Sequence, residues 1–171
     1  MVAAGYLHTL PFPFQFDDFS SIRNNRALDD PLDLGTIWRF RPSRFITHIS
    51  LAWNIAITGR SPGGLRVVNL LIHLGASLLV GRIVAELARG LAPRRDSRRP
   101  APEAIGLLAA LLFAAHPLAT QAVTYLIQRT TSLAPLLELA AVAAYLQARR
   151  SASRSLLAAS WGLATRSGAT K

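Results

Sequence analysis

Two adjacent carboxylates, Asp17 and Asp18, are the residues of this chain whose types and spacing best suit chemistry. They stand among aromatic residues in the stretch 13–19, just after a short apolar N-terminal segment. One carboxylate of such a pair can accept a proton from a hydroxyl, while the other orients that hydroxyl or holds a cation. In a membrane protein, an acidic pair at the end of an apolar segment is a candidate site at the membrane face. The alternative is a solvated loop or a helix start, since Asp is a common N-cap residue.

A second polar group begins at His116-Pro117 and continues through Gln121, Tyr125 and Arg129. Gln121 and Tyr125 are four residues apart and can share one helical face. Arg129 offers a planar, permanently charged fork that suits a phosphate or pyrophosphate. The alternative is a helix end anchored by Tyr and Arg among lipid headgroups.

Arg44 is a further candidate for a lipid-linked phosphate, because it lies in the basic and aromatic stretch 38–45. Contact with anionic lipid headgroups is the alternative. The four His residues lack the spacing of a metal site, and the chain has neither cysteine nor a glycine-rich phosphate loop. The sequence therefore predicts no metal site.

The net charge of +10 in 171 residues is carried almost wholly by Arg, while half of the residues are hydrophobic. A nucleic-acid-binding domain would gather these charges on one face of a folded domain. Here they cluster in 92–102 and 149–154, between apolar segments, as in the cytoplasmic loops of membrane proteins. We therefore expect membrane lipids, and no nucleic acid, as partners.

Three segments are apolar enough to be candidate spans. They are 66–91, 103–122 and 131–148. Residues 1–10 are too short to cross a bilayer and are interpreted as the end of a truncated span, with an ordinary apolar N-terminus as the alternative. Residues 166–171 form a tail. The predicted fold is an all-α polytopic membrane helical bundle.

The region 11–65 is predicted to be a large first loop outside the cytoplasm, carrying an amphipathic helix at 43–58 that lies at the interface or packs on the spans. Within 66–91, a stripe of Asn69, His73, Ser77 and Gly81 recurs every four residues. In a bilayer such a stripe belongs against other helices rather than against lipid.

The number of crossings predicts on which side each loop lies. If both Arg-rich loops are cytoplasmic, three crossings place the outer loop 11–65 and the connection 116–129 together on the other side. The acidic pair and the His-Pro turn should therefore open onto one compartment.

The motifs resemble those of a known family. Asp17-Asp18 with Asn24-Asn25, Arg44-Phe45, the run from Asn69 to His73 and the block from His116-Pro117 to Gln128-Arg129 are similar to the N-terminal membrane half of bacterial tetratricopeptide-repeat proteins. These in turn resemble the transmembrane-and-tetratricopeptide protein O-mannosyltransferases of the GT-C glycosyltransferase superfamily. The match covers residues 11–150, and the block after His116 is its most specific part.

The resemblance implies a partial GT-C-like fold and the transfer of a sugar, with mannose as one candidate, from a polyprenyl-phosphate donor to a hydroxyl of an acceptor protein. It makes Asp17 or Asp18 the catalytic base, with Asp18 marginally favoured, and assigns Arg44 and Arg129 to the donor phosphate. His116, Gln121 and Tyr125 would shape the pocket. A divalent cation stays open.

The expected location is the bacterial inner membrane, with the site facing outward. The missing spans and repeats lead us to expect a fragment that is inactive alone. The alternative is a non-catalytic membrane scaffold module.

Overall fold

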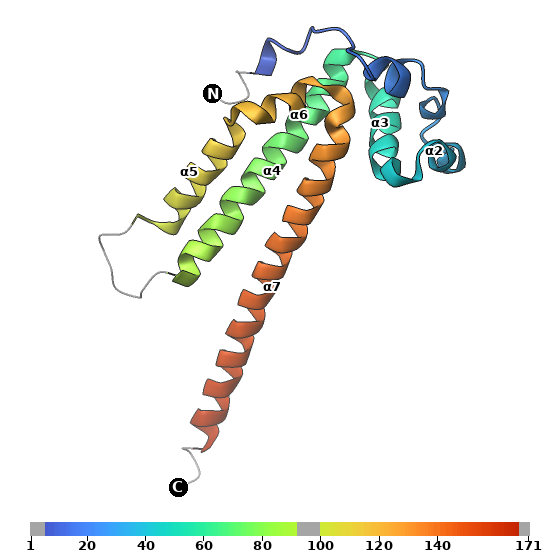
Figure 1. Ribbon diagram of the computed structural model, residues 1–171. Coiled ribbons are helices and arrows are strands. Elements are labelled where there is room, and N and C mark those ends of the chain that lie inside the picture. The colour runs from blue at the N-terminus through green and yellow to red at the C-terminus, as the bar shows by residue number, and fades with distance from the viewer. Residues whose placement is uncertain (1–5, 92–99, 168–171) are drawn as a thin grey trace.

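The computed structural model describes residues 6–91 and 100–167, with side chains as far as residue 150. Three helices form its bundle, α4 (Pro62–Leu91), α5 (Pro102–Ala114) and α7 (Arg129–Ser167), of which α4 and α7 are long (Figure 1). No strand occurs in these two ranges. The prediction of an all-α membrane bundle is confirmed.

Short helices form the rest of the described chain. Between the N-terminal segment and α4 lie helical turns at Phe19–Arg23, Arg26–Leu28 and Pro42–Arg44, the helix α2 (Leu34–Phe40) and the helix α3 (Phe45–Thr58). Between α5 and α7 lie a turn at Pro117–Ala119, the helix α6 (Thr120–Thr124) and a turn at Leu126–Gln128. Figure 1 places α2 and α3 beside one end of the bundle, at the same end as α6.

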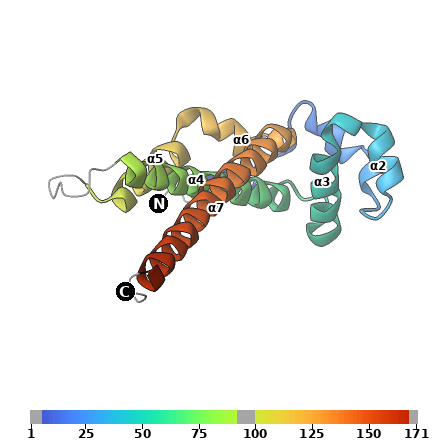
Figure 2. The same ribbon diagram turned by 90° about the horizontal axis from the view of Figure 1, so that it is seen from below.

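Helix α4 is the centre of the bundle, since both α5 and α7 pack against it; α7 crosses it obliquely (Figure 2). The predicted polar stripe is confirmed, because Asn69, His73, Ser77 and Gly81 are all buried. Gly81 meets Gly106 of α5, where a Cβ on Gly106 would lie 2.5 Å from the Gly81 carbonyl oxygen. Glycine is therefore required for the backbones to approach this closely.

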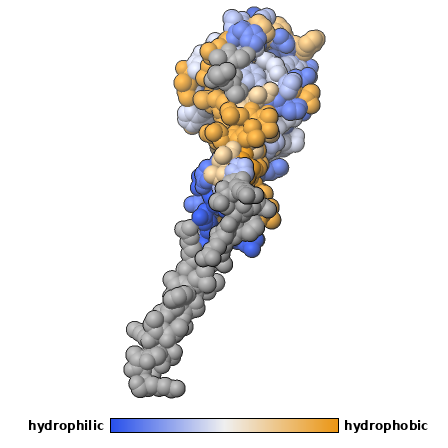
Figure 3. All heavy atoms as spheres, turned by 90° about the vertical axis from the view of Figure 1, so that its left-hand side faces the viewer, coloured by the Kyte–Doolittle hydropathy of each residue, from blue (hydrophilic) through white to orange (hydrophobic). Residues whose placement is uncertain are grey.

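Two helical stretches are long and apolar enough to cross a membrane, Pro62–Leu91 and Leu126–Arg150. A third crossing results if α5 and Pro117–Thr124, which are bent by 56° at the break between them, act as one span. The candidate span 103–122 is thus divided at His116-Pro117, where proline cannot continue the helix. Figure 3 shows hydrophobic side chains gathered across the middle of the face that includes α5.

Two predicted loops have different outcomes. Residues 149–154, expected to form a loop, are helical, because α7 continues to Ser167. Most of the loop 92–102, like the first five residues of 1–10 and the end of the 166–171 tail, falls outside the described residues. At the end of α4, Glu86 bonds to Arg89 at 2.6 Å and Arg150 at 3.0 Å, which ties α7 to α4.

Helix α3 has an inverted distribution of side chains. Its polar residues Thr47, His48 and Asn54 are buried, whereas Ile46, Trp53 and Ile57 are exposed. With this polar face buried, α3 packs against α4 and α7. A helix with polar groups inside and apolar groups outside suits a surface that faces lipid rather than water.

Candidate functional site

A cavity of about 310 Å³ lies where the N-terminal segment, α3 and the start of α7 meet. We call it the polar cavity. Its lining residues are Asp17, Ser20, Ser21, Arg41, Arg44, Tyr125, Ile127, Gln128, Thr130 and Thr131. The acidic segment and the block that follows His116 therefore reach one end of the bundle, as the crossing count predicts.

The two aspartates have opposite surroundings. Asp17 is exposed and lines the polar cavity. Asp18 is fully buried, and its carboxylate accepts hydrogen bonds from the backbone N–H of Ile127 at 3.0 Å and of Gln15 at 3.2 Å. Asp18 thus fastens the N-terminal segment to the turn before α7. The geometry favours Asp17 over Asp18 as the carboxylate that can reach a substrate.

Burial raises the pKa of Asp18, and the backbone hydrogen bonds from Gln15 and Ile127 and the charge of Arg66 offset this only in part. The fold therefore disfavours the ionised form of this carboxyl group. Phe16, two residues earlier, has a φ of 41°, a left-handed conformation that is uncommon for a bulky side chain. The helical turn that follows places neighbouring side chains on different faces, so Asp17 is exposed while Asp18 is buried.

Arg129 is fully buried, and its guanidinium is saturated by the protein. Nε donates to Asn69 at 2.7 Å, one terminal nitrogen donates to the hydroxyl and carbonyl of Ser50, and the other donates to Asn54 at 2.8 Å and to the Leu65 carbonyl at 2.9 Å. The expectation that Arg129 holds a donor phosphate does not fit this arrangement. It joins α3, α4 and α7 instead.

The sequence analysis did not identify Arg66 as a residue that shapes the site. It is fully buried and donates to the carbonyls of Thr124 at 3.0 Å, Leu10 at 3.2 Å, Pro13 at 2.8 Å and Phe12. It therefore holds the N-terminal segment against the end of α6. The signal in the sequence is an arginine at the edge of an apolar helix, where a charge requires partners.

Arg44 and Tyr125 lie in the polar cavity as predicted site residues, but His116 and Gln121 do not. His116 caps the turn at Pro117–Ala119 by accepting from the Leu118 N–H, and it lines a separate apolar hollow. Gln121 is exposed on α6.

Arg41, Gln128 and Thr130 also line the polar cavity. Gln128 shares the face of Tyr125, and Arg41 stands in the same basic and aromatic stretch as Arg44, so both had a signal. Thr130 had none. Its buried hydroxyl has no hydrogen-bond partner. In the part of the chain that the structure describes, no group of three His, Cys, Asp or Glu residues could hold a metal ion.

Comparisons with known proteins identify relatives. Human protein O-mannosyl-transferase TMTC4 is 34% identical over 157 residues, which are 82% of this chain and 21% of that protein. Tmtc3 of Drosophila melanogaster is 32% identical over 151 residues, covering 76% of this chain and 16% of the relative. Protein O-mannosyl-transferase TMTC4 of Mus musculus is 32% identical over 151 residues, covering 79% of this chain and 20% of the relative.

No family model and no solved structure matches the chain. The chain spans about a fifth of the length of the curated relatives that it matches. Over most of its own length it is therefore similar to one segment of the protein O-mannosyl-transferases of the TMTC family, which confirms the resemblance predicted from its motifs.

Proposed function

We propose that this chain is the donor-handling segment of a membrane glycosyltransferase, which transfers a sugar from a polyprenyl phosphate to a hydroxyl of an acceptor protein. One observation carries the proposal. An exposed carboxylate, Asp17, and two cations, Arg41 and Arg44, line the same polar cavity at the end of a bundle of candidate spans. The printed names of the relatives, protein O-mannosyl-transferases, supply the reaction class.

The cavity residues divide the reaction between them. The acceptor hydroxyl gives its proton to the Asp17 carboxylate while its oxygen bonds to the anomeric carbon of the sugar. The bond from that carbon to the phosphate oxygen breaks, and the electron pair leaves with the phosphate. Arg41 and Arg44 bind the charge that develops on the departing phosphate. Attack opposite to the leaving group inverts the anomeric configuration.

We place this cavity on the outer side of the bacterial inner membrane. The opposite end of the bundle carries Arg82, Arg89, Arg149 and Arg150, and cytoplasmic ends of spans are enriched in such residues. Because the chain spans about a fifth of its relatives, the site needs support from other parts of the protein, and we expect the chain alone to be inactive. A divalent cation is not required by the reaction as written.

A scaffold module without catalysis is the competing proposal. It is favoured by one observation: Asp18 and Arg129, the carboxylate and the cation that the motifs ranked highly, both hold the fold together. The two proposals differ in what they expect of Asp17, which makes no side-chain contact that the fold requires among those described.

An exchange experiment separates them. The matching segment of human TMTC4 is replaced by this chain, and mannose transfer to an acceptor protein is measured in membranes. We expect Asp17→Asn to lower the rate by about 100-fold or more, the usual contribution of a positioned base. Asp30→Asn is the matched control, because Asp30 is exposed and does not line the cavity.

If Asp17→Asn transfers mannose within a few fold of the unmodified exchange protein, the catalytic proposal fails and the scaffold module is supported. If the exchange protein does not assemble, the same comparison is made on lipid-donor binding. The wild-type segment should then retain the donor, while Arg41→Gln with Arg44→Gln should lose it. Equal retention by both would contradict the proposed donor site.

A further inference from the structure

Phe16 differs from the two phenylalanines nearest to it in the chain. The rings of Phe14 and Phe19 lie with their centroids 6.2 Å apart, and the guanidinium carbon of Arg23 stands 5.4 Å from the centre of the Phe19 ring. Phe16 makes no ring or cation contact of this kind among the described residues, and 85% of its surface is exposed. The fold therefore gains little from packing this ring.

The backbone at Phe16 is also unfavourable for its side chain. Its φ of 41° lies in the left-handed region, which glycine and asparagine adopt at lower cost than a bulky residue does. Strained positions of this kind cluster at functional sites, where the strain is compensated by a binding role. A large ring that the backbone disfavours and the core does not use indicates a contact with a binding partner.

The position of Phe16 ties that contact to the polar cavity. Asp17, the next residue, lines the cavity, whereas Phe16 does not. Consecutive Cα atoms are about 3.8 Å apart, so the exposed ring stands at the edge of the cavity beside the proposed base. Whatever covers the ring therefore lies within a few ångströms of the Asp17 carboxylate.

Lipid does not suit the surroundings of Phe16. Gln15, Asp17 and Ser20 are all exposed on the same short segment. Placing an amide, a carboxylate and a hydroxyl in hydrocarbon together with one ring would cost more than burial of the ring returns. The partner of Phe16 is therefore a molecule that approaches from the aqueous side.

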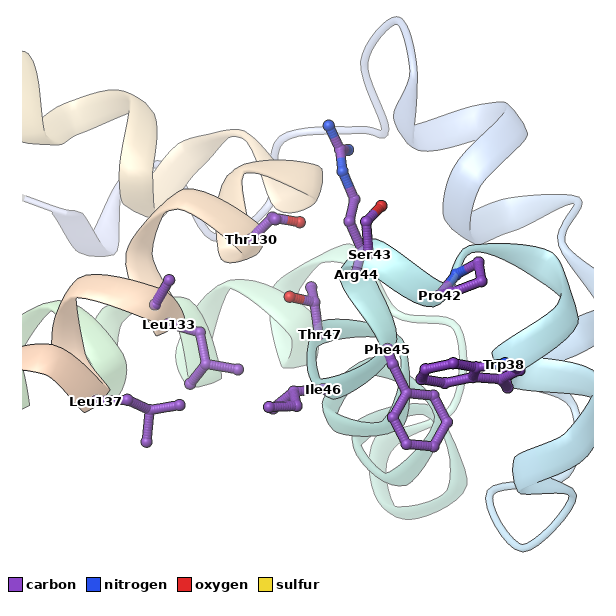
Figure 4. Close-up of a pocket in the computed structure, with 11 residues that line it drawn as sticks. Trp38, Pro42, Ser43, Arg44, Phe45, Ile46, Thr47, Thr130, Leu133 and Leu137 are labelled. Carbon is purple, nitrogen blue, oxygen red and sulfur yellow. The ribbon is translucent and has the colours of Figure 1, made fainter.

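The lipid-linked donor also approaches elsewhere. In Figure 4, the Arg44 side chain extends away from Ile46 of α3 and Leu137 of α7. These exposed apolar residues belong to a candidate span and to the helix beside it, and no residue of the segment 6–18 lines the hollow that they form with Arg44. The other reactant that must reach Asp17 is the acceptor protein.

We propose that Phe16 binds an apolar side chain of the acceptor protein, one or two residues from the hydroxyl that receives the sugar. The inference rests on the proposed function, in which that hydroxyl gives its proton to Asp17. In an extended acceptor, residues one and two positions away lie about 3.5 and 7 Å from the modified residue, within reach of the ring. Phe16 thus makes the protein select a Ser or Thr that has apolar neighbours, since exposed aromatic side chains are effective anchors in protein interfaces.

The test uses the exchange protein, in which this chain replaces the matching segment of human TMTC4, and two synthetic acceptor peptides. Each peptide contains one hydroxyl, in Val-Thr-Val or in Gln-Thr-Gln, within otherwise identical sequences. We expect the valine peptide to have the lower KM. Phe16→Asn, which suits the left-handed backbone, should raise that KM about tenfold and leave the KM of the glutamine peptide within about twofold. Phe16→Tyr keeps the ring and should preserve the preference.

Leu32→Asn is the matched control, because Leu32 is 74% exposed and does not line the cavity. It should leave both KM values unchanged. Equal KM values for the two peptides in the unmodified exchange protein, or an equal rise for both in Phe16→Asn, would overturn the proposal. A loss of assembled protein in Phe16→Asn but not in Leu32→Asn would also overturn it, since the ring would then pack on another part of the protein.

A cross-linking measurement covers the case in which neither peptide is glycosylated. Benzoylphenylalanine is introduced at position 16, or at position 32 as the control, and the exchange protein is irradiated with the acceptor protein. Cross-links from position 16 and none from position 32 would support the contact. Equal or absent cross-links from the two positions would reject it.

The outcome is separable from that of the proposed function. Asp17→Asn should lower kcat for both peptides and leave the ratio of their KM values unchanged. Residual transfer that keeps the preference for the valine peptide in Asp17→Asn, at an undiminished kcat, would reject the base and retain the acceptor contact. Transfer that requires Asp17 but shows no effect of Phe16→Asn would retain the base and reject the contact.

Discussion

The polar cavity and the buried polar cluster next to it use the same kinds of residue for opposite purposes. In the buried cluster, which consists of Asp18, Asn54, Arg66, Asn69 and Arg129, every member is enclosed and bonded to the protein. In the polar cavity, Asp17 and Arg41 are exposed and Arg44 is partly so. Aspartate and arginine therefore serve as scaffold in one region and as candidate chemistry in the other, and Asp17 and Asp18 show both roles on adjacent residues.

The difference shows why residue type alone ranks sites poorly. A buried charge is costly unless it is paired or hydrogen-bonded, so a charged residue inside a membrane bundle is often committed to its neighbours. A charged residue is free to bind a substrate when its side chain is not already bonded to other parts of the fold. Three experiments test this comparison. Two of them compare a substitution in the buried cluster with the matching substitution in the polar cavity, and the third compares Asp18 with a neutral residue at the same position.

Arg129→Gln should have the largest effect. It removes the donors to Asn69, Asn54, Ser50 and the Leu65 carbonyl, and each buried acceptor left unpaired costs about 1–3 kcal/mol. The free energy of unfolding should fall by more than about 4 kcal/mol, measured by SDS titration in mixed micelles.

Arg44→Gln is the matched control for Arg129→Gln, since it removes the same group from the cavity. It should change stability by less than about 0.5 kcal/mol. Similar losses in the two variants would show that the cavity arginine also belongs to the scaffold, and the comparison would fail.

The two aspartates provide the next largest contrast. Asp18→Ala leaves the backbone N–H groups of Ile127 and Gln15 without their acceptor and should cost about 2–3 kcal/mol. Asp17→Ala should change the unfolding free energy by less than about 0.5 kcal/mol. The same SDS titration measures both. A large loss from Asp17→Ala would mean that its carboxylate supports the fold.

A pH series should show the smallest effect, and its sign is informative. Because burial raises the pKa of Asp18 in the folded protein, the folded state holds that proton more tightly than the unfolded state does. Between the ordinary Asp pKa and the raised value, this group makes stability fall as pH rises. Above the raised value, its contribution is constant.

The comparison that isolates this contribution is the chain with and without Asp18→Asn. Asn cannot titrate, so the difference in unfolding free energy between the two proteins should change over that pH window and then level off. Hydrogen bonds from Thr36 lower the pKa of Asp33, so its contribution to stability rises with pH. Both proteins contain Asp33, and its contribution therefore cancels in the difference between them. A difference that does not vary with pH would show that Asp18 keeps an ordinary pKa.

The pattern of residues along the chain was enough to predict the helical class, the central apolar helix and its buried stripe from Asn69 to Gly81. Periodicity carries this information, because polar and small residues repeated every four positions must share one face, and in an apolar solvent that face turns inward. Counting the crossings was also enough to bring the acidic segment and the end of α6 to one end of the bundle.

Which charged groups stay open to a ligand depends on the packing of distant segments. Asp17 and Asp18 are neighbours with the same chemistry, and they differ because only the Asp18 carboxylate meets the backbone N–H of Ile127, which is distant in the sequence. Arg129 is enclosed because groups from α3 and α4 bind it, whereas Arg44 stays partly exposed in the polar cavity. Such enclosure depends on contacts between distant segments, which no local pattern of residues records.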